Sequence, residues 1–410
     1  MFCLNKRKIF NDPVYGFITI PYEIIFDIIE HPYFQRLRRI QQLGLTNLVY
    51  PGANHTRFQH ALGAVHLMSK AVQVLRSKGI TITEAEAEAV TIAVLLHDIG
   101  HGPFSHALEK TIIAQVHHEE LSLVCMHLLN SEFQGKLGTA IEIFTGTYFK
   151  KFLHQLVSSQ IDVDRLDYLT RDSYFTGVHE GVVGYARLIE MMDVHDDGLV
   201  IEQKGIYSVE KFIIARRVMY WQVYLHKTVI CAEQMLIKAL KRAKYLVQNG
   251  TPIFATPVLH YFLFHDPDAK EFSQQADVMQ KFAQLDDTDI YVALKAWQYC
   301  DDKVLAFLSH AIIHRRLFKI ELENEPISAA KIARVVEKVK QKYNVDEFDL
   351  PYFVFNDSTS NSAYTSGGDN IHIKFRNGKV LDVANASDHL NLAALSETVI
   401  KHYLCHPKYL

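Results

Sequence analysis

Residues 97–106, HDIGHGPFSH, combine the side chains that a metal-dependent reaction needs. His97 and Asp98 directly follow the uncharged run 89–96, which is typical of a buried helix. The glycines and the proline of the stretch end that helix, and two more histidines, His101 and His106, lie within it. Burying an aspartate beside imidazoles costs several kcal/mol unless a metal ion or a hydrogen-bond network compensates. We therefore expect a metal site where this helix ends.

Two residues from other parts of the chain can complete the set of metal ligands. His60 lies on the helix predicted for residues 56–78, and Asp164 belongs to a D-x-D-x-x-D cluster on a later helix. A mononuclear site needs about four protein ligands or fewer, with positions left for water and substrate. Neighbouring helices could bring four side chains to one point: His60, His97, Asp98 and Asp164. This mixed nitrogen and oxygen set suits a divalent ion, for which Mn, Fe, Zn, Ni and Mg are open alternatives.

One face of the later helix carries side chains suited to a sugar phosphate. Asp164, Tyr168 and Asp172 follow one another at intervals of four residues, so they share a face, and Arg165 lies beside Tyr168. This stripe offers a metal ligand, a cation, an aromatic ring and a second carboxylate. The alternative is a solvated charged face, which accounts for the neighbouring aspartates but not for the aromatic ring between them.

Start and stop signals define the helices that must position these residues. Thr83 and Glu86 form a capping box that begins the helix leading to His97, and Gly79 ends the helix that carries His60. We predict further helices over residues 22–43 (with a break at His31-Pro32), 150–172 and 208–248, and mainly helical structure over 269–345.

The two ends of the chain have a different character. Residues 1–20 read as an extended arm with a turn at residues 11–13, and alternating residues around Asn377-Gly378 predict a β-hairpin. The chain is therefore expected to be mainly α, with a small α+β region at its C-terminal end. We expect three parts: a helical domain with its arm over 1–250, a helical extension over 251–350, and the hairpin-containing region over 351–410.

Composition excludes several classes of protein. A formal net charge of −3 argues against nonspecific binding to nucleic acid. The five cysteines are scattered and form no C-x-x-C pair, which indicates a reducing compartment rather than a disulfide framework. No apolar run approaches the roughly 18 residues of a membrane span, and the N-terminus lacks a secretory signal. We expect a cytoplasmic protein without a membrane partner.

The residues of these motifs and their order along the chain resemble those of a known family. From Lys8 to about Lys227, the segments KIFNDPVYG, PYFQRLRRIQQLG, VYPGANHTRFQHALG, LLHDIGHGPFSH, HHEELS and IDVDRLDYLTRD follow one another. They are similar to the HD-domain metal-dependent phosphohydrolases, and most similar to the SAM-and-HD-domain deoxynucleoside triphosphate triphosphohydrolases and their bacterial relatives. The resemblance implies an HD-domain helical fold for residues 1–250.

The resemblance also implies roles for individual residues. The metal ligands would be the four named above, and His118 would be the general acid toward the leaving 5′ oxygen. His106 would be oriented by an acidic neighbour, here Glu109 where the family has aspartate. Phosphate contacts would come from Arg57, His101 and Arg165. The 3′-hydroxyl would be held by Gln42 and Asp172, and C2′ crowded by Leu43 and Tyr224. The remaining substrate contacts would be Tyr168 and Arg216.

The family is switched on by nucleotides bound between subunits, so the resemblance implies a homo-oligomer, a dimer or a tetramer. Lys8, Asn11, Arg38 and Lys227 match parts of that regulatory site. The guanine-reading aspartate is replaced by Glu30. Two activator-binding arginines correspond to acidic residues here, Asp193 and Glu202. We therefore expect an activator other than a guanine nucleotide, or none.

The predicted function is metal-dependent hydrolysis of deoxynucleoside triphosphates to deoxynucleoside and triphosphate. Two alternatives stay open at this point. One is another HD phosphohydrolase, such as a nucleotidase or a hydrolase of cyclic nucleotides or (p)ppGpp. The other is a nucleotide sensor without turnover, against which the complete metal-ligand set and His118 argue.

Overall fold

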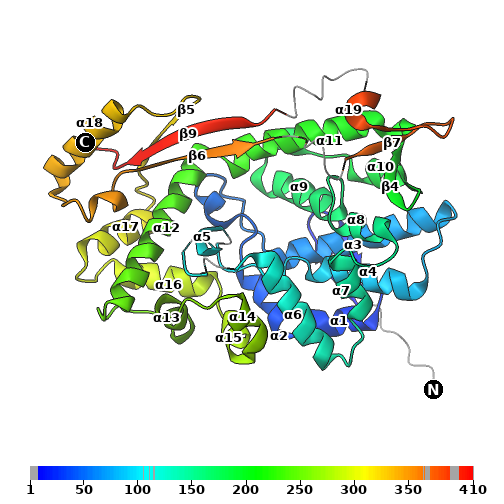
Figure 1. Cartoon of the computed structure of the whole chain (residues 1–410), viewed down its shortest axis with the longest axis horizontal. Coiled ribbons are helices and arrows are strands. Elements are labelled where there is room, and N and C mark those ends of the chain that lie inside the picture. Colours follow the sequence, from blue (N-terminus) through cyan, green and yellow to red (C-terminus); the bar gives the residue numbers. More distant parts are fainter. Residues whose placement is uncertain are drawn as a thin grey trace.

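A computed structural model of the chain describes residues 8–104, 106–109, 111–113, 116–362, 364, 370–387 and 397–409. The fold is mainly α, as predicted (Figure 1). Its first half contains α1 (Glu23–Glu30), α2 (Pro32–Gln35), α3 (Arg57–Ser77), α4 (Glu84–Leu96), α5 (His106–Glu109), α6 (His118–Glu132), α7 (Gly138–Phe144), α8 (Lys151–Val157), α9 (Val163–Thr176) and α10 (Tyr185–Glu190). Short 3₁₀ turns cover Arg36–Arg39, Gly44–Leu48, His179–Gly181 and Gln203–Gly205.

The second half continues with α11 (Ile206–Met219), α12 (Lys227–Gln248), α13 (Pro257–Phe264), α14 (Ala269–Gln274), α15 (Ala276–Phe282), α16 (Asp287–Trp297), α17 (Lys303–Ile313), α18 (Ala329–Tyr343), a 3₁₀ turn (Leu350–Tyr352) and α19 (Val383–Ala386). None of the described helices is both long and apolar enough to cross a membrane.

Three helices build the centre of the first half. α3 packs against both α4 and α9. The capping box predicted for α4 is present, because the Glu86 amide donates to the Thr83 hydroxyl at 3.2 Å and the Thr83 amide donates to the Glu86 carboxylate at 2.8 Å. Every residue of α4 from Ala89 to Leu96 is buried, so this helix is a core element whose C-terminal end opens onto the site.

Two of the predicted elements are wrong in their details. Residues 9–19 form a β-hairpin of β1 (Ile9–Asp12) and β2 (Gly16–Thr19), not an extended arm. The helix predicted for 150–172 is two helices, α8 and α9, because Asp162 caps a new helix by accepting the Arg165 amide at 2.7 Å.

The segment predicted as one helix over 208–248 is also divided. α11 passes into a π-helical turn, Tyr220–Tyr224, before α12 begins at Lys227. The mainly helical region 269–345 contains one strand, β5 (Lys319–Glu323). The π-helical turn presents Tyr220 and Tyr224 toward α9.

Two small sheets complete the fold. β3 (Met192–His195), β4 (Gly198–Glu202), β7 (His372–Lys374) and β8 (Val380–Asp382) form one, in which β7 and β8 are the predicted hairpin around Asn377-Gly378. β5, β9 (Val399–His406) and β6 (Phe355–Asn361) form the other, and Figure 1 shows β9 and β6 running together along one side of the molecule. Because β7 pairs with β4, the C-terminal region shares a sheet with residues that follow the central helices.

Candidate metal centre

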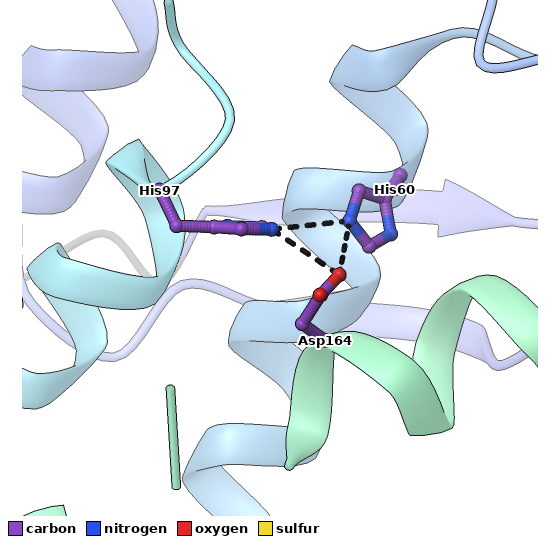
Figure 2. A group of neighbouring side chains, drawn as sticks. All are labelled: His60, His97 and Asp164. Atoms are coloured by element: carbon purple, nitrogen blue, oxygen red, sulfur yellow. Dashed lines mark hydrogen bonds and ion pairs between the residues drawn. The ribbon is translucent and has the colours of Figure 1, made fainter. Parts of the chain in front are cut away.

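Three ligand atoms from three elements meet at one point. His60 comes from α3, His97 directly follows α4, and Asp164 begins α9 (Figure 2). The Asp164 Oδ1 atom lies 3.0 Å from His60 Nε2 and 3.2 Å from His97 Nε2, and the two nitrogens are 3.4 Å apart. Bonds of about 2.1 Å that meet at about 90–109° place two ligand atoms about 3.0–3.4 Å apart. The spacing of these three atoms therefore suits one shared ion.

The hydrogen bonds of the two imidazoles show which nitrogen is free to bind metal. His97 Nδ1 lies 2.6 Å from the carbonyl oxygen of Val94, so Nδ1 carries the proton and donates. His60 Nδ1 lies 2.7 Å from Asp167 Oδ2, a carboxylate that orients the ring in the same way. Both rings in their neutral form thus direct an Nε2 lone pair at Asp164, an arrangement that a cation stabilises.

The charge balance of the site points in the same direction. Burial lowers the pKa of His60, but its hydrogen bonds to the carboxylates of Asp164 and Asp167 outweigh burial and raise the pKa to about 10. Burial also lowers the pKa of His97, yet Asp98 and Asp164 raise it to about 9. The surrounding carboxylates therefore attract positive charge to this point, and the donor set fits a divalent metal ion.

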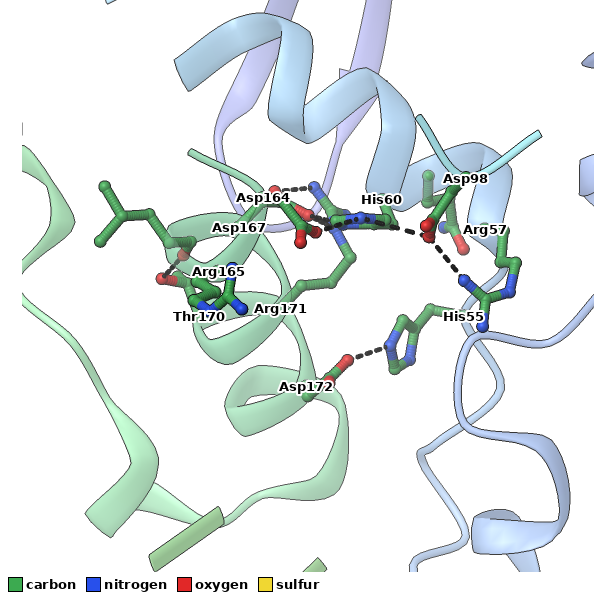
Figure 3. Close-up of polar contacts among 12 residues, drawn as sticks. His55, Arg57, His60, Asp98, Asp164, Arg165, Asp167, Thr170, Arg171 and Asp172 are labelled. Carbon is green, nitrogen blue, oxygen red and sulfur yellow. Dashed lines mark hydrogen bonds and ion pairs between the residues drawn. The ribbon is translucent and has the colours of Figure 1, made fainter. Parts of the chain in front are cut away.

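Asp98, the fourth predicted ligand, lies at the edge of this group. Its Oδ1 atom is 3.4 Å from His97 Nε2 and its Oδ2 atom 3.7 Å from His60 Nε2. Oδ2 also accepts a hydrogen bond of 2.5 Å from Arg57 Nη1. Asp98 thus joins the metal group to the first predicted phosphate contact (Figure 3).

A second group of ionisable side chains lies beside the first. The rings of His101 and His118 are 3.9 Å apart between centroids, and His101 Nδ1 is 3.3 Å from Asp98 Oδ1. The Glu109 carboxylate accepts from His118 Nδ1 at 2.9 Å. Glu109 was expected to orient His106; in the structure its partner is His118, and the His106 side chain lies outside the described part of the chain.

The face of α9 beyond Asp164 carries a polar cluster. The Asp172 carboxylate accepts from Tyr224 Oη at 2.7 Å. It also pairs with His55 Nε2 at 2.7 Å (Figure 3). The Gln42 amide nitrogen of the backbone donates to the His55 carbonyl at 3.0 Å, and the buried Gln42 Oε1 has no partner among the described residues. These contacts bring the predicted sugar-binding residues to one side of the site.

Other predicted substrate contacts surround this cluster. The Tyr168 ring lies 6.5 Å from the ring of His60 and 6.2 Å from that of Tyr224. Leu43 is partly buried against the core, and the Arg216 guanidinium lies 5.9 Å from the Tyr220 ring. Arg165, predicted to contact phosphate, is paired with Asp162, the residue that caps α9.

Three residues that the sequence did not single out complete the site. His55 read as a loop residue, but its ring is buried, stacks on Phe175 at 4.5 Å and holds Asp172. Asp167 orients His60. The buried Asp287 at the start of α16 accepts the backbone amides of Gln41 at 2.8 Å and Phe104 at 3.2 Å.

Asp287 thereby fixes two loops of the site from another helix. Gln41 precedes the predicted sugar contacts, and Phe104 follows the HDIGHGP stretch with a φ of +51°, a conformation that costs a residue with a side chain about 1 kcal/mol or more. Burial raises the pKa of Asp287 to about 7 despite the two amide hydrogen bonds.

The predicted regulatory residues are spread over several elements, and two of them lie at the N-terminal hairpin. Lys8 precedes β1 and places its Nζ 4.1 Å from the Phe26 ring, and Asn11 pairs with Phe17 in the hairpin. Arg38 stacks on Phe58 at 3.6 Å, Glu30 ends α1 on the surface, and Lys227 begins α12. The acidic residues that replace the family's arginines are engaged inside the chain: Asp193 with Lys374, and Glu202 with Lys78, each at 2.7 Å.

Comparison with known proteins agrees with this geometry. The family model of the HD domain matches residues 57–172, and that of the HD-associated region matches residues 183–251. The Bacillus subtilis protein named Uncharacterized protein YwfO is 33% identical over 400 residues, which are 94% of this chain and 88% of that protein. A crystal structure of a phosphohydrolase from Bacteroides thetaiotaomicron has 53% identity and a TM-score of 0.94, and the match covers 98% of this chain and 100% of that one.

Two relatives carry a more specific name. The human deoxynucleoside triphosphate triphosphohydrolase SAMHD1 is 29% identical over 383 residues, 81% of this chain and 57% of that protein. The Dictyostelium discoideum homologue of that enzyme is 34% identical over 258 residues, 58% of this chain and 50% of that protein. The chain thus spans about half the length of these two relatives. This chain belongs to the HD-domain phosphohydrolase family, as shown by its fold, its metal-ligand motif and the relatives that it matches over most of their length.

Proposed function

We propose that this chain hydrolyses deoxynucleoside triphosphates to deoxynucleoside and inorganic triphosphate in a metal-dependent reaction. One observation carries the proposal: Asp172, held by His55 and Tyr224, lies two turns along α9 from the metal ligand Asp164. A carboxylate two helical turns from the metal ligand can accept a hydrogen bond from a sugar hydroxyl while the phosphoryl group of the same nucleotide lies at the metal. The names of the human and Dictyostelium relatives support the same reaction.

His60, His97 and Asp164, with Asp98 beside them, would hold the divalent ion. When bound, such an ion supplies Lewis-acid polarisation of the phosphoryl group and lowers the pKa of water. The Nδ1 contacts to Asp167 and Val94 keep both imidazoles in the orientation that this binding requires.

The remaining residues bind the triphosphate and move a proton. Arg57 lies beside Asp98, where its charge offsets phosphate charge. Burial and the nearby Arg57 hold the pKa of His101 well below its ordinary value, so His101 would contact phosphate as a neutral hydrogen-bond donor. The Glu109 carboxylate accepts from His118 Nδ1 and orients the ring, whose Nε2 proton would pass to the 5′ oxygen. The bond between the α-phosphorus and the 5′ oxygen breaks as a water oxygen bonds to phosphorus, so the products are the nucleoside and triphosphate.

The sugar and base would contact the other side of the site. Asp172 and Gln42 would hold the 3′-hydroxyl, and Leu43 with Tyr224 would crowd C2′ and disfavour a ribose. We assign the remaining contacts with the substrate to Tyr168, Arg165 and Arg216.

The test is product identification. Metal-loaded protein is incubated with each deoxynucleoside and ribonucleoside triphosphate, and the phosphate product is separated by anion exchange. We expect triphosphate from the deoxynucleotides only, with the activity lost in Asp164→Ala and kept in Asp27→Ala, which removes an exposed carboxylate from α1.

Each other outcome contradicts the proposal in its own way. Monophosphate as product would identify a nucleotidase. Nucleotide binding without any product, and unchanged in Asp164→Ala, would identify a sensor.

A further inference from the structure

A chain of buried charges leads away from the metal ligand His60. Asp167 accepts from His60 Nδ1 at 2.7 Å, and both side chains are fully buried. Arg171, one turn further along α9, donates to both oxygens of the same carboxylate, from Nε at 3.0 Å and from Nη2 at 3.1 Å. This two-point contact fixes the plane of the Asp167 carboxylate and, through it, the ring of His60 (Figure 3).

The third arm of the Arg171 guanidinium reaches the N-terminal hairpin. Nη1 donates to Asp12 Oδ2 at 2.7 Å, with the Arg171 side chain fully buried and that of Asp12 5% exposed. The other oxygen of Asp12 accepts the backbone amides of Val14 and Tyr15, each at 2.9 Å, which sets the turn between β1 and β2. The carboxylate of Asp12 therefore binds the backbone of the turn with one oxygen and the Arg171 side chain with the other.

The turn is also held against α3, the helix that carries His60. The Tyr15 ring stacks on His66 at 5.0 Å and lies 5.5 Å from the Arg171 guanidinium. Gly63 of α3 leaves the room that the charged pair needs, because a Cβ atom there would lie 1.9 Å from Asp167 Oδ1 and 2.3 Å from Arg171 Nη2.

We propose that Asp12, Arg171 and Asp167 form a positioning relay through which the N-terminal hairpin sets the orientation of the metal ligand His60, and with it the affinity of the centre for its ion. The inference rests on the metal centre of the proposed function. It makes the hairpin, which is far from the ligands in sequence, a structural part of the metal site. None of the three residues touches the ion; each acts through its neighbour.

The test measures binding of Mn²⁺ alone, without turnover, by the EPR signal of the free ion. Asp12→Asn keeps an oxygen for the two turn amides and removes the charge that faces Arg171. We expect this variant to bind Mn²⁺ about 10-fold more weakly, and Asp167→Asn about 10–100-fold more weakly, as is usual when a partner behind a ligand is lost. Asp27→Asn, which removes the same charge from an exposed position, is the control and should bind like the parent.

A double variant separates positioning from a loss of stability. If Asp12 acts through Asp167, then Asp12→Asn adds little to Asp167→Asn, and the two effects on affinity are not additive. Additive effects, or an Asp12→Asn protein that melts at a lower temperature but binds Mn²⁺ like the parent, would reduce Asp12 to a structural role and overturn the relay.

These outcomes are distinct from those that test the activity. A parent chain that binds Mn²⁺ but hydrolyses no nucleotide, while its variants bind as expected, would leave the relay standing and overturn the proposed reaction. A parent chain that does not bind Mn²⁺ would overturn the relay together with the metal centre.

Discussion

In the proposed reaction, Asp172 is the residue on which the choice of substrate depends. It accepts hydrogen bonds from a buried histidine and a partly buried tyrosine, and bonds to a charged group contribute about 1.5–3 kcal/mol each. We expect Asp172→Asn to lower kcat/KM for deoxynucleoside triphosphates by about 10–100-fold, while the affinity for Mn²⁺ stays unchanged because Asp172 does not face the ion. Steady-state kinetics and a metal titration on the same preparation check this. A weaker metal affinity would place Asp172 in the metal centre instead.

His118 provides the second prediction for a single residue. If it protonates the leaving oxygen, His118→Ala lowers kcat by about 100-fold or more with little change in KM. Glu109→Gln keeps an acceptor for Nδ1 but replaces a hydrogen bond to a charged group by a weaker one to a neutral group, so we expect a smaller loss of about 10-fold. Unchanged kcat in His118→Ala would assign the proton donor to another group.

The sequence predicted the ligands more completely than their partners. His60, His97 and Asp164 could be named from their motif. Their supporting contacts could not, because a motif gives residue types and spacing but not which ring nitrogen meets which oxygen. Asp167 read as one of several solvated carboxylates, and His55 as a loop residue. Both are buried, and only the packing of α3 against α9 shows it.

At the level of elements, a capping motif identified where a helix begins. It was less useful for deciding whether a long predicted helix is divided into two. Thr83 with Glu86 correctly marked α4. Asp162 carries a comparable signal inside the predicted helix 150–172, where α8 ends at Val157 and Asp162 caps the start of α9. The π-helical turn at Tyr220–Tyr224 has no such signal, because its extra residue follows from contacts with α9 rather than from local propensity.

The start of α16 leads to a prediction about pH. The pKa of Asp287 is about 7 in the folded chain against about 3.9 when unfolded, so the folded state binds more protons between these values. The stability that this proton contributes is therefore lost as the pH rises toward 7. Between pH 5 and pH 7 the parent should lose about 2 kcal/mol of unfolding free energy relative to Asp287→Asn.

Denaturant unfolding at both pH values measures this difference. Asp301→Asn, which changes an exposed carboxylate at the end of the same helical region, should behave like the parent. Equal pH dependence in the parent and in Asp287→Asn would show that Asp287 is ionised throughout, and would contradict the raised pKa that we attribute to its burial.

For the whole molecule, the sequence predicted a helical body and a C-terminal hairpin, and both are present. It did not predict that β7 adds to β4 in parallel, because a pairing between residues about 170 positions apart leaves no local pattern. That pairing explains one of the two acidic residues that depart from the family, Asp193, because it brings Lys374 beside it. Lys374 of β7 holds Asp193 of β3, and Lys78 holds Glu202 of β4 together with the Glu190 and Met192 carbonyls.

These ion pairs lead to the last prediction, which concerns regulation of the whole assembly. Positions where the family has arginines for an activator carry carboxylates that are already neutralised within the chain. A guanine nucleotide would meet these ion pairs there instead of the family's arginines, so it should neither accelerate hydrolysis nor change the oligomeric state. We expect initial rates with a deoxynucleoside triphosphate to agree within about twofold with and without GTP, and light scattering to give one mass in both conditions. A rate that rises about tenfold or more with GTP would contradict this prediction. Such a rise corresponds to a coupling free energy of about 1.4 kcal/mol between an activator site and the active site, and it would show that these ion pairs do not block an activator.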